Sequence, residues 1–202
     1  MADRGRPRSF DRDVALARAM DVFWDKGYQG ASMAELTTAM GIGSPSLYAA
    51  FGSKEDLFRA SVARYKARDG SAIWAPLGTA PTAVEAVRGV LMASARAFSR
   101  PKRPRGCLIV LSALHADEMS ETVRRELIRL RAGNAAQLSA RIRRGMEAGE
   151  IAAGADPDMI ANYYVTVQQG MSIQARDGAG RAILETIAKA ALAAWGPLTG
   201  SA

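Results

Sequence analysis

The chain has 202 residues, a formal net charge of +7 and a sequence isoelectric point of about 10.0. This length can bury a sizeable core in one or two domains, and the charge favours a polyanionic partner, although a basic surface can also serve solubility alone. A single cysteine excludes an intrachain disulfide and suits a reducing compartment, so we expect a cytoplasmic protein.

Residues 1–12 are polar and basic and lack the apolar stretch of a secretory signal. Three arginines in this segment, Arg4, Arg6 and Arg8, alternate with glycine and proline. A thin, extended, positively charged arm of this kind fits the narrow minor groove of A·T-rich DNA, where the negative potential is deepest. The alternative is a basic tail with only general electrostatic attraction to DNA.

The next segment has the spacing of an amphipathic helix. Its apolar residues lie at positions i, i+3, i+4 and i+7, namely Leu16, Ala19, Met20 and Phe23. This pattern predicts a helix over about residues 11–26 that ends at Gly27.

Residues 32–51 predict two short helices around a glycine turn. Ser32 and Glu35 can form a capping box, in which the hydroxyl and the carboxylate satisfy free backbone N–H groups at the helix start. Gly41 can stop this helix in the left-handed conformation, and Pro45 fits the first turn of the next helix, where a missing N–H costs nothing. Such a pair is a helix-turn-helix, which places one helix in the DNA major groove, although any small helical bundle uses caps and glycine turns.

The rest of the chain is also predicted to be helical, and strand signals are absent. We expect helices over residues 54–69, 82–98, 107–115, 120–148, 156–177 and 181–195, the last of them closed by Gly196 and Pro197. Glycines and prolines interrupt the pattern at residues 70–81, which predicts a connector there. We therefore expect an all-α fold with domains over residues 1–69 and 70–202. No stretch approaches ~18 uninterrupted apolar residues, so no membrane span is expected.

The helix pair and its flanks resemble a known family. The residues that carry the resemblance are Gly27-Tyr28, Ser32, Ala39-Met40-Gly41-Ile42, Ser46-Leu47-Tyr48, Phe51, Ser53-Lys54-Glu55 and Leu57-Phe58. Over about residues 10–68 the chain resembles the N-terminal domain of TetR/AcrR-family repressors, and the remainder is similar to the family in layout, length and helicity. The resemblance implies a helix-turn-helix DNA-binding domain, a helical ligand-sensing and dimerisation domain, and a homodimer whose repression a ligand relieves.

Several residues of this region are candidate DNA contacts. Tyr48 and Lys54 match the phosphate-contacting tyrosine and lysine of the family, and the helix start at Ser32 can direct its hydroxyl and free N–H groups at a phosphate. The residues that would then face base edges are Ser44, Pro45 and Ser46. Because this set offers no Arg, Asn or Gln for a bidentate base contact, we infer that serine hydroxyls, thymine methyl groups and DNA shape carry much of the sequence preference. We expect Phe51 in the core; the alternatives are a core position for Tyr48 and a solvated charge for Lys54.

Two helices of the C-terminal half present apolar faces that predict a dimer interface. The candidate interface residues are Met159, Tyr163, Tyr164, Val167, Ile183, Ile187, Ala191 and Trp195. Burial within the same chain is the alternative for part of this set. A dimer is still required, because two recognition helices must lie ~34–36 Å apart to read successive major grooves.

A ligand pocket is predicted between the helices at residues 54–69 and 156–177. Its candidate lining residues are Trp74, Met92, Phe98, Leu111, His115, Met119, Tyr163, Gln168 and Met171. An apolar, methionine-rich lining suits a flat or greasy molecule, although such residues are more often core. One histidine and one cysteine do not make a convincing metal site, so no metal or other cofactor is expected.

Cys107 stands at the expected start of a helix and follows four cations, Arg100, Lys102, Arg103 and Arg105. Both features should lower the pKa of the thiol and raise its reactivity. Gly-Cys-Leu at this place, followed by Ser-Ala and a charged helix, resembles the N-ethylmaleimide-reductase repressor branch, whose regulators sense electrophiles and oxidants. This implies redox or electrophile sensing at Cys107; the alternative is a small buried hydrophobe.

These features predict a homodimeric, sequence-specific repressor that a small-molecule ligand or thiol modification releases from a palindromic operator in double-stranded DNA. The alternative is a constitutive architectural DNA-binding protein without an effector. An enzyme is not expected, because the sequence lacks a Ser/His/Asp set, a metal-ligand cluster and a phosphate loop. The Gly41-Ile42-Gly43 sequence lies between helices rather than after a strand.

Overall fold

The computed structural model describes residues 10–113 and 119–200, and every regular element in these ranges is a helix. The elements in chain order are α1 (Arg12–Gly30), α2 (Met33–Met40), α3 (Ser44–Phe51), α4 (Lys54–Tyr65), the π-helical turn η1 (Lys66–Gly70), α5 (Ser71–Trp74), α6 (Pro76–Thr79), α7 (Ala83–Phe98), α8 (Leu108–Leu111), α9 (Glu121–Glu147), α10 (Pro157–Arg176), α11 (Arg181–Leu192) and α12 (Trp195–Thr199). The predicted all-α fold is confirmed. Arg4, Arg6, Arg8 and His115 lie outside the described residues.

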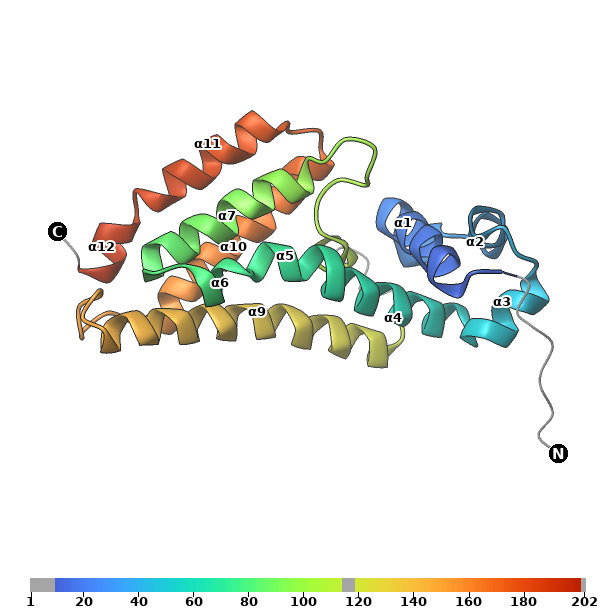
Figure 1. Cartoon of the computed structure of the whole chain (residues 1–202), viewed down its shortest axis with the longest axis horizontal. Helices are drawn as coiled ribbons and strands as arrows, with labels where there is room; N and C mark the ends of the chain where they lie inside the picture. The colour runs from blue at the N-terminus through green and yellow to red at the C-terminus, as the bar shows by residue number, and fades with distance from the viewer. Residues whose placement is uncertain (1–9, 114–118, 201–202) are drawn as a thin grey trace.

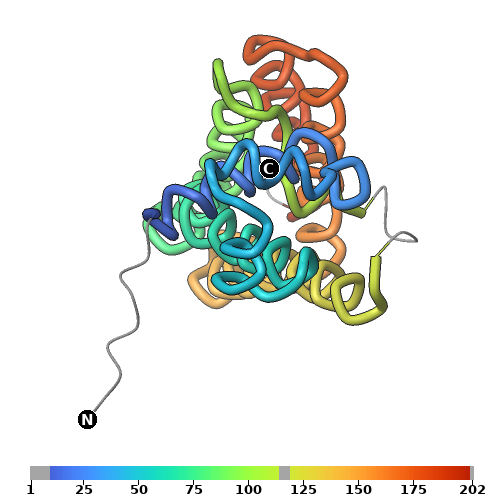
Figure 2. The backbone as a smooth tube through the Cα atoms, turned by 90° about the vertical axis from the view of Figure 1, so that its right-hand side faces the viewer, coloured from blue at the N-terminus to red at the C-terminus, as the bar shows by residue number. Residues whose placement is uncertain are grey.

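The helices form an elongated molecule (Figure 1). α1, α2 and α3 lie at one end, and α4, η1 and α5 form an almost continuous rod that runs from them along the molecule. α9 extends beside this rod, while α7, α10 and α11 pack against one another toward the opposite end. Figure 2, viewed from the end that carries α1–α3, shows α7 and α11 together on one side of the bundle and α9 on the other.

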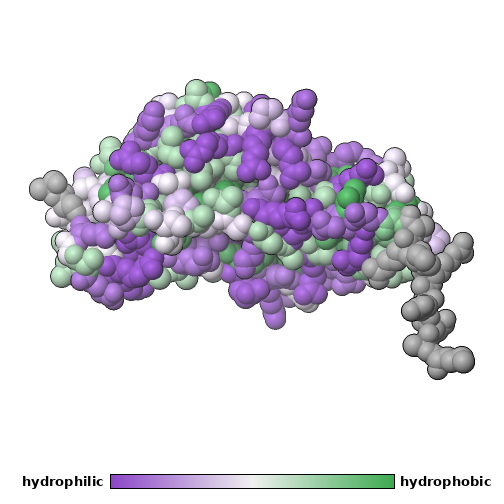
Figure 3. Space-filling view, in the orientation of Figure 1, coloured by the Kyte–Doolittle hydropathy of each residue, from purple (hydrophilic) through white to green (hydrophobic). Residues whose placement is uncertain are grey.

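One face of the molecule is largely hydrophilic (Figure 3). Figure 3 shows hydrophilic residues over much of one face, with apolar residues in small scattered groups. Ion pairs join neighbouring elements, such as Arg59 of α4 and Glu126 of α9, whose charged atoms lie 2.8 Å apart. In the described ranges, no helix has both the length and the apolar character that crossing a bilayer requires.

The caps and turns of the helix pair form as the sequence predicts. The Ser32 hydroxyl accepts a hydrogen bond from the Glu35 backbone at 3.2 Å, and the Glu35 carboxylate accepts one from the Ser32 backbone at 3.1 Å. Gly41 has a φ of +69°, a left-handed conformation that glycine adopts without steric cost. Gly27 interrupts α1 with a φ of +73°, and the four predicted apolar residues of α1 are all buried.

The connector expected at residues 70–81 is wrong as a break in the helices, because η1, α5 and α6 keep most of this segment helical. Gly70 adopts right-handed helical angles of φ −66° and ψ −44°. Pro76 takes the first position of α6, where its missing N–H leaves no helical hydrogen bond unmade. The glycines and Pro76 are therefore part of short helical turns, and the non-helical residues immediately before α7 are residues 80–82.

Two further helix ends differ from expectation. The helix predicted over residues 107–115 is limited to α8 among the described residues, where the Ser112 hydroxyl donates to the Leu108 carbonyl at 2.7 Å and competes with the helical ladder. Gly196 and Pro197 do not close the last helix at Trp195. They lie inside α12, which is separate from α11. A continuous helix is disfavoured here because Pro197 has no backbone N–H to donate to the preceding turn.

We predict that Glu35→Gln weakens the protein mainly near neutral pH. The hydrogen bond from Lys26, together with those from Ser32, lowers the pKa of Glu35 from 4.5 to about 2. A carboxylate whose pKa is lowered by folding stabilises the folded state above its ordinary pKa, and this contribution is lost as the pH falls from 4.5 toward 2. Thermal unfolding midpoints measured from pH 7 to pH 2 should therefore fall less steeply for the variant than for the wild type.

Glu147→Gln provides the control, because it removes an exposed carboxylate near the end of α9. Its midpoints should follow the wild-type profile. Parallel profiles for Glu35→Gln and the wild type would show that the capping box does not contribute to the acid sensitivity.

Candidate nucleic-acid interface and ligand pocket

α3 presents an exposed face of uncharged side chains. Leu47 and Phe51 are buried and hold α3 against the neighbouring helices, which confirms Phe51 as a core residue. The rest of the α3 surface carries Ser44, Pro45 and Tyr48, which are exposed, and Ser46, which is half-buried. Tyr48 is 51% exposed, so the alternative of a core tyrosine is wrong.

Two polar residues flank this face. Ser32 is exposed at the start of α2, and Lys54 begins α4 with its ammonium 4.8 Å from the centre of the Tyr28 ring. Burial lowers the pKa of Lys54, whereas the face of the aromatic ring attracts the cation. Lys54 therefore contacts the Tyr28 ring while its side chain stays partly exposed to solvent.

Two arginines at the same end of the molecule were not among the predicted DNA contacts. Arg12 lies over the Phe51 ring, 4.5 Å from its centre, and its Nε donates to the Ala50 carbonyl at 3.5 Å. Arg18 is exposed, and its Nη1 lies 3.4 Å from the place where a Cβ on Gly41 would stand, in the turn between α2 and α3. Both arginines lie on the polar side of α1. A search for the spacing of apolar residues does not consider that side.

A junction of ion pairs joins this end of the molecule to the rest. Arg103, in the loop after α7, lies 3.0 Å from Asp21 of α1 and 3.5 Å from Asp69 of η1. Arg100 of the same loop lies 3.0 Å from Asp69. The Arg103 guanidinium also stands over Trp24 of α1, 5.3 Å from the ring centre. Asp69 is buried, so the two arginines provide the opposite charge that a buried carboxylate needs.

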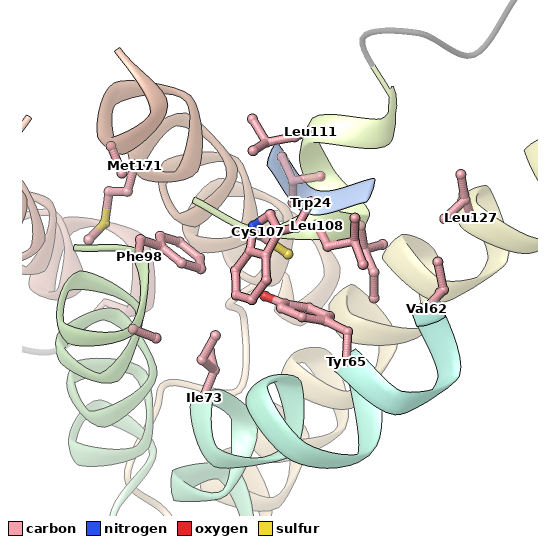
Figure 4. Close-up of a cluster of buried hydrophobic side chains, with 14 of the residues drawn as sticks. Trp24, Val62, Tyr65, Ile73, Phe98, Cys107, Leu108, Leu111, Leu127 and Met171 are labelled. Carbon is pink, nitrogen blue, oxygen red and sulfur yellow. The ribbon is translucent and has the colours of Figure 1, made fainter. Parts of the chain in front are cut away.

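Behind the ion pairs, the aromatic residues connect α1 to the loop. Trp24 packs edge-on against Tyr65 with ring centres 4.8 Å apart, and Tyr65 is hydrogen-bonded to the Cys107 side chain. Figure 4 shows these three residues together within a cluster of buried side chains. The Cys107 N–H donates to Ser172 Oγ of α10 at 2.8 Å, and Gly106, with a φ of +79°, lies so close that a Cβ would stand 2.6 Å from the Ser172 carbonyl. The loop is thus fixed on both sides.

A cavity of about 430 Å³ lies beside Tyr65 and Cys107. Apolar residues on one side are Ile73, Trp74, Leu77, Ile109 and Val110. Side-chain amides on α9 and α10 are Asn134, Gln137, Gln168 and Gln169. Two of the predicted lining residues, Trp74 and Gln168, therefore lie in the pocket. The other amides were missed because a search for apolar spacing passes over polar residues that share a helix face.

Six predicted lining residues do not line this cavity: Met92, Phe98, Leu111, Met119, Tyr163 and Met171. Phe98 and Met171 are buried in the core, because α7 and α10 pack directly against each other. Tyr163 points away from the core and is 37% exposed. The cavity lies between the α5–α6 segment and the α9–α10 pair, which moves the site toward residues that sequence analysis assigned to a connector.

The expected low pKa of Cys107 is wrong. Burial raises the pKa of the thiol and outweighs the hydrogen bond from Tyr65, which lowers it. Two of the four preceding cations, Arg100 and Arg103, are engaged with Asp69 and other partners in the junction. In addition, α8 has only four residues and supplies little dipole at its start. The thiol is a buried group, and Cys107 is one of the residues that line the cavity.

The residues predicted for a dimer interface divide into two groups. Tyr164 and Ala191 are buried within the chain, where the Tyr164 hydroxyl donates to the Ala191 carbonyl at 3.4 Å. They are wrong as interface residues because α10 and α11 pack against each other through them. The residues of the set that stay exposed or half-buried are Met159, Tyr163, Val167, Ile183, Ile187 and Trp195. Ile173 of α10, which sequence analysis did not include, is 37% exposed.

Two family models match this chain. Residues 15–61 match the model described as bacterial regulatory proteins, tetR family, and residues 83–190 match the tetracyclin repressor-like C-terminal domain. Among curated proteins, the chain is 36% identical over 193 residues to the HTH-type transcriptional repressor ComR of Escherichia coli, across 95% of this chain and 92% of the relative. It is also 36% identical over 114 residues to the HTH-type transcriptional repressor BdcR of E. coli, across 56% of this chain and 57% of the relative.

Among solved structures, a cysteine mutant of the TetR-family transcriptional regulator CifR, complexed with 26-bp double-strand operator DNA, is 47% identical. It superposes with a TM-score of 0.90 across 95% of this chain and 100% of that chain. The reduced form of E. coli NemR is 22% identical, with a TM-score of 0.75 across 89% of this chain and 94% of that chain. At that identity the likeness to NemR shows a shared fold alone.

We predict that Arg103→Gln destabilises the protein by roughly 1–2 kcal/mol, because the buried Asp69 loses one of its two charged partners and Trp24 loses the cation over its ring. The free energy of unfolding in urea measures the effect. Arg105→Gln is the matched control in the same loop, since Arg105 is exposed and reaches only the Ala179 carbonyl at 3.5 Å. Equal losses for the two variants would contradict the importance of the junction.

We predict that iodoacetamide alkylates Cys107 more slowly than free cysteine at pH 7. The raised pKa leaves less thiolate at that pH, and burial restricts access. Alkylation should accelerate as the pH rises through a range above the ordinary thiol pKa. Since the chain has one cysteine, mass spectrometry follows the reaction directly, and urea-unfolded protein serves as the control that reacts at the free rate. Faster alkylation of the folded protein would reverse this conclusion.

Proposed function

The chain belongs to the TetR family of bacterial transcriptional regulators, and on that premise we propose that it is a homodimeric repressor which a small molecule releases from a palindromic operator. The observation that carries this proposal is the exposed, uncharged face of α3 with Tyr48 on it and the cation of Lys54 beside it. A repressor is active where the chromosome lies, so we place it in the cytoplasm.

The proposal assigns α3 to the major groove. Tyr48 and Lys54 contact phosphates, and so does the start of α2 at Ser32. Ser44, Pro45 and Ser46 face the base edges. The likeness to CifR, whose structure contains operator DNA, supports this use of the same end of the molecule.

The arm residues Arg4, Arg6 and Arg8 belong to the same proposal. They precede α1, which begins beside α3 because Arg12 stacks on Phe51. An arm attached there starts close to the DNA and can follow the adjacent minor groove.

Dimerisation is assigned to the exposed faces of α10 and α11. The residues that remain available for it are Met159, Tyr163, Val167, Ile183, Ile187 and Trp195. Two copies joined there carry their α3 helices on the same side of the pair, as reading two half-sites of a palindrome requires. The division into a DNA-binding part over residues 1–69 and a sensing and dimerisation part over residues 70–202 is part of this proposal.

The release step is assigned to the cavity. Tyr65 forms part of its wall and also packs on Trp24, so a ligand that shifts Tyr65 acts on α1. One face of α10 also connects the cavity to α1. Gln168 lines the cavity, Ser172 accepts a hydrogen bond from the loop, and Arg176 lies 3.3 Å from Asp25 of α1. A ligand releases DNA only if it binds one arrangement of these contacts more tightly than the other.

Thiol modification is the second proposed route of release. Because Cys107 is buried and lines the cavity, a modifying reagent must first enter the space that the ligand uses. Its added bulk would displace Tyr65, which is hydrogen-bonded to the thiol. An architectural DNA binder without an effector is the competing function, and it needs neither the cavity nor a palindrome.

Sequence-selective binding tests the function. Fragments of the source genome selected by the purified protein should contain a palindrome, and this palindrome should be preferred over bulk DNA by ~10³-fold or more. A protein that binds palindromic and bulk DNA equally would be an architectural binder.

We predict different salt responses for two variants of the interface. Lys54→Gln removes one phosphate charge contact per subunit, so the slope of log affinity against log salt should become shallower by about two for a dimer. Tyr48→Phe removes an uncharged hydrogen bond, so the affinity should fall while the slope stays the same. Fluorescence anisotropy with labelled operator at several salt concentrations measures both.

Lys189→Gln is the control, because it removes an exposed cation on α11 at the far end of the molecule from α3 (Figure 1). It should change neither quantity. An unchanged slope for Lys54→Gln would remove Lys54 from the interface.

A further inference from the structure

The 430 Å³ cavity has two chemically different walls. α5, α6 and α8 supply an apolar wall that includes Trp74 and Ile109. α9 and α10 supply the amide wall, formed by Asn134, Gln137, Gln168 and Gln169. Asn134 and Gln137 are three residues apart on α9 and so share one face of that helix.

Gln168 is 3% exposed and lines the cavity, so the part of its side chain that is not packed against the protein faces that space. Among the described residues, the fully buried side-chain atoms without a hydrogen-bond partner are Asp21 Oδ1, Trp24 Nε1 and Ser94 Oγ, so the Gln168 amide is not sealed from the cavity. A ligand that displaces water from this amide loses free energy unless it replaces the hydrogen bonds of that water. The cavity that Gln168 lines is the space from which such a ligand reaches it. The amide offers both a donor and an acceptor to that ligand.

The charge of the lining restricts the ligand further. No aspartate or glutamate is among the described lining residues, and the lining includes one cation, Lys66, whose side chain is exposed. A bound cation would lose its hydration without meeting an opposite charge. An anion at the amide wall would meet uncharged partners there, because the amides belong to α9 and α10 whereas Lys66 lies on η1. An uncharged molecule avoids both costs.

We propose that the effector is an uncharged, partly apolar molecule whose carbonyl, amide or hydroxyl group is hydrogen-bonded to Gln168. Its apolar part lies against Trp74 and its neighbours on the opposite wall. The inference rests on the proposed function only in calling this molecule an effector; the selectivity of the cavity is a property of the lining itself.

Three probes of one skeleton test the charge preference. Benzamide, benzoate and benzylammonium share a ring and differ in charge, and ligand-detected NMR titrations of the full-length protein give their affinities. We expect benzamide to bind at least about tenfold more tightly than either ion.

Two substitutions at one position test the role of Gln168. Gln168→Leu should weaken benzamide binding about tenfold and leave the two ions unchanged. Gln168→Glu should reverse the order and favour benzylammonium. Gln174→Leu is the matched control, since it makes the same change at an exposed position of α10 outside the cavity lining. Circular dichroism confirms that each variant is folded.

Equal affinities for the three probes, no benzamide binding up to its solubility limit, or benzamide binding unaffected by Gln168→Leu would each overturn the inference. Operator binding is measured on the same samples, so that failure of the inference about the effector can be told apart from failure of the proposed function. Protein that binds a palindrome but shows no preference for benzamide rejects the effector class alone. Protein that prefers benzamide but recognises no palindrome rejects the repressor and leaves the cavity chemistry in place.

Discussion

The buried carboxylate of Asp69 is the constraint that joins the two ends of this molecule. A carboxylate in that position requires opposite charge within reach, and Arg100 and Arg103 supply it from the loop after α7. Arg103 also reaches Asp21 and the face of Trp24, so satisfying Asp69 fixes α1 at the same time. The π-helical turn η1, which carries Asp69, lies where the rod passes from the end that carries α1–α3 toward the cavity. Turns of this kind are frequent at functional sites.

The cavity and the end that carries α1–α3 therefore share their supporting residues. Tyr65 is part of the cavity wall and touches Trp24, and the loop that holds the junction ends in Cys107, which also lines the cavity. Gly106 allows this arrangement because its lack of a side chain lets the loop approach α10 closely. Any side chain at that position would push the loop, and with it the two arginines, away from α1 and η1.

The N-terminal helices were predictable because local chemistry determines them. The Ser32 capping box, the left-handed Gly41 and the apolar spacing of α1 each depend on residues a few positions apart. The cavity was predicted less well, since its amides come from helices far apart in the sequence and apolar spacing does not mark them. The pKa of Cys107 was mispredicted for the same reason. Its sequence neighbours are cations, but burial by residues distant in the sequence raises its pKa, and Arg100 is paired with an acidic residue.

The uncharged face of α3 separates affinity from selectivity. The residues proposed to face the bases are Ser44, Pro45 and Ser46, which carry no ionisable group, whereas the proposed phosphate contacts include Lys54. Ions in solution compete with contacts to the sugar–phosphate chain on cognate and random DNA alike, so added salt weakens both kinds of complex in parallel. The ratio of cognate to random affinity determines how well one site is found among millions. This ratio then stays nearly constant when the ionic strength inside the cell changes.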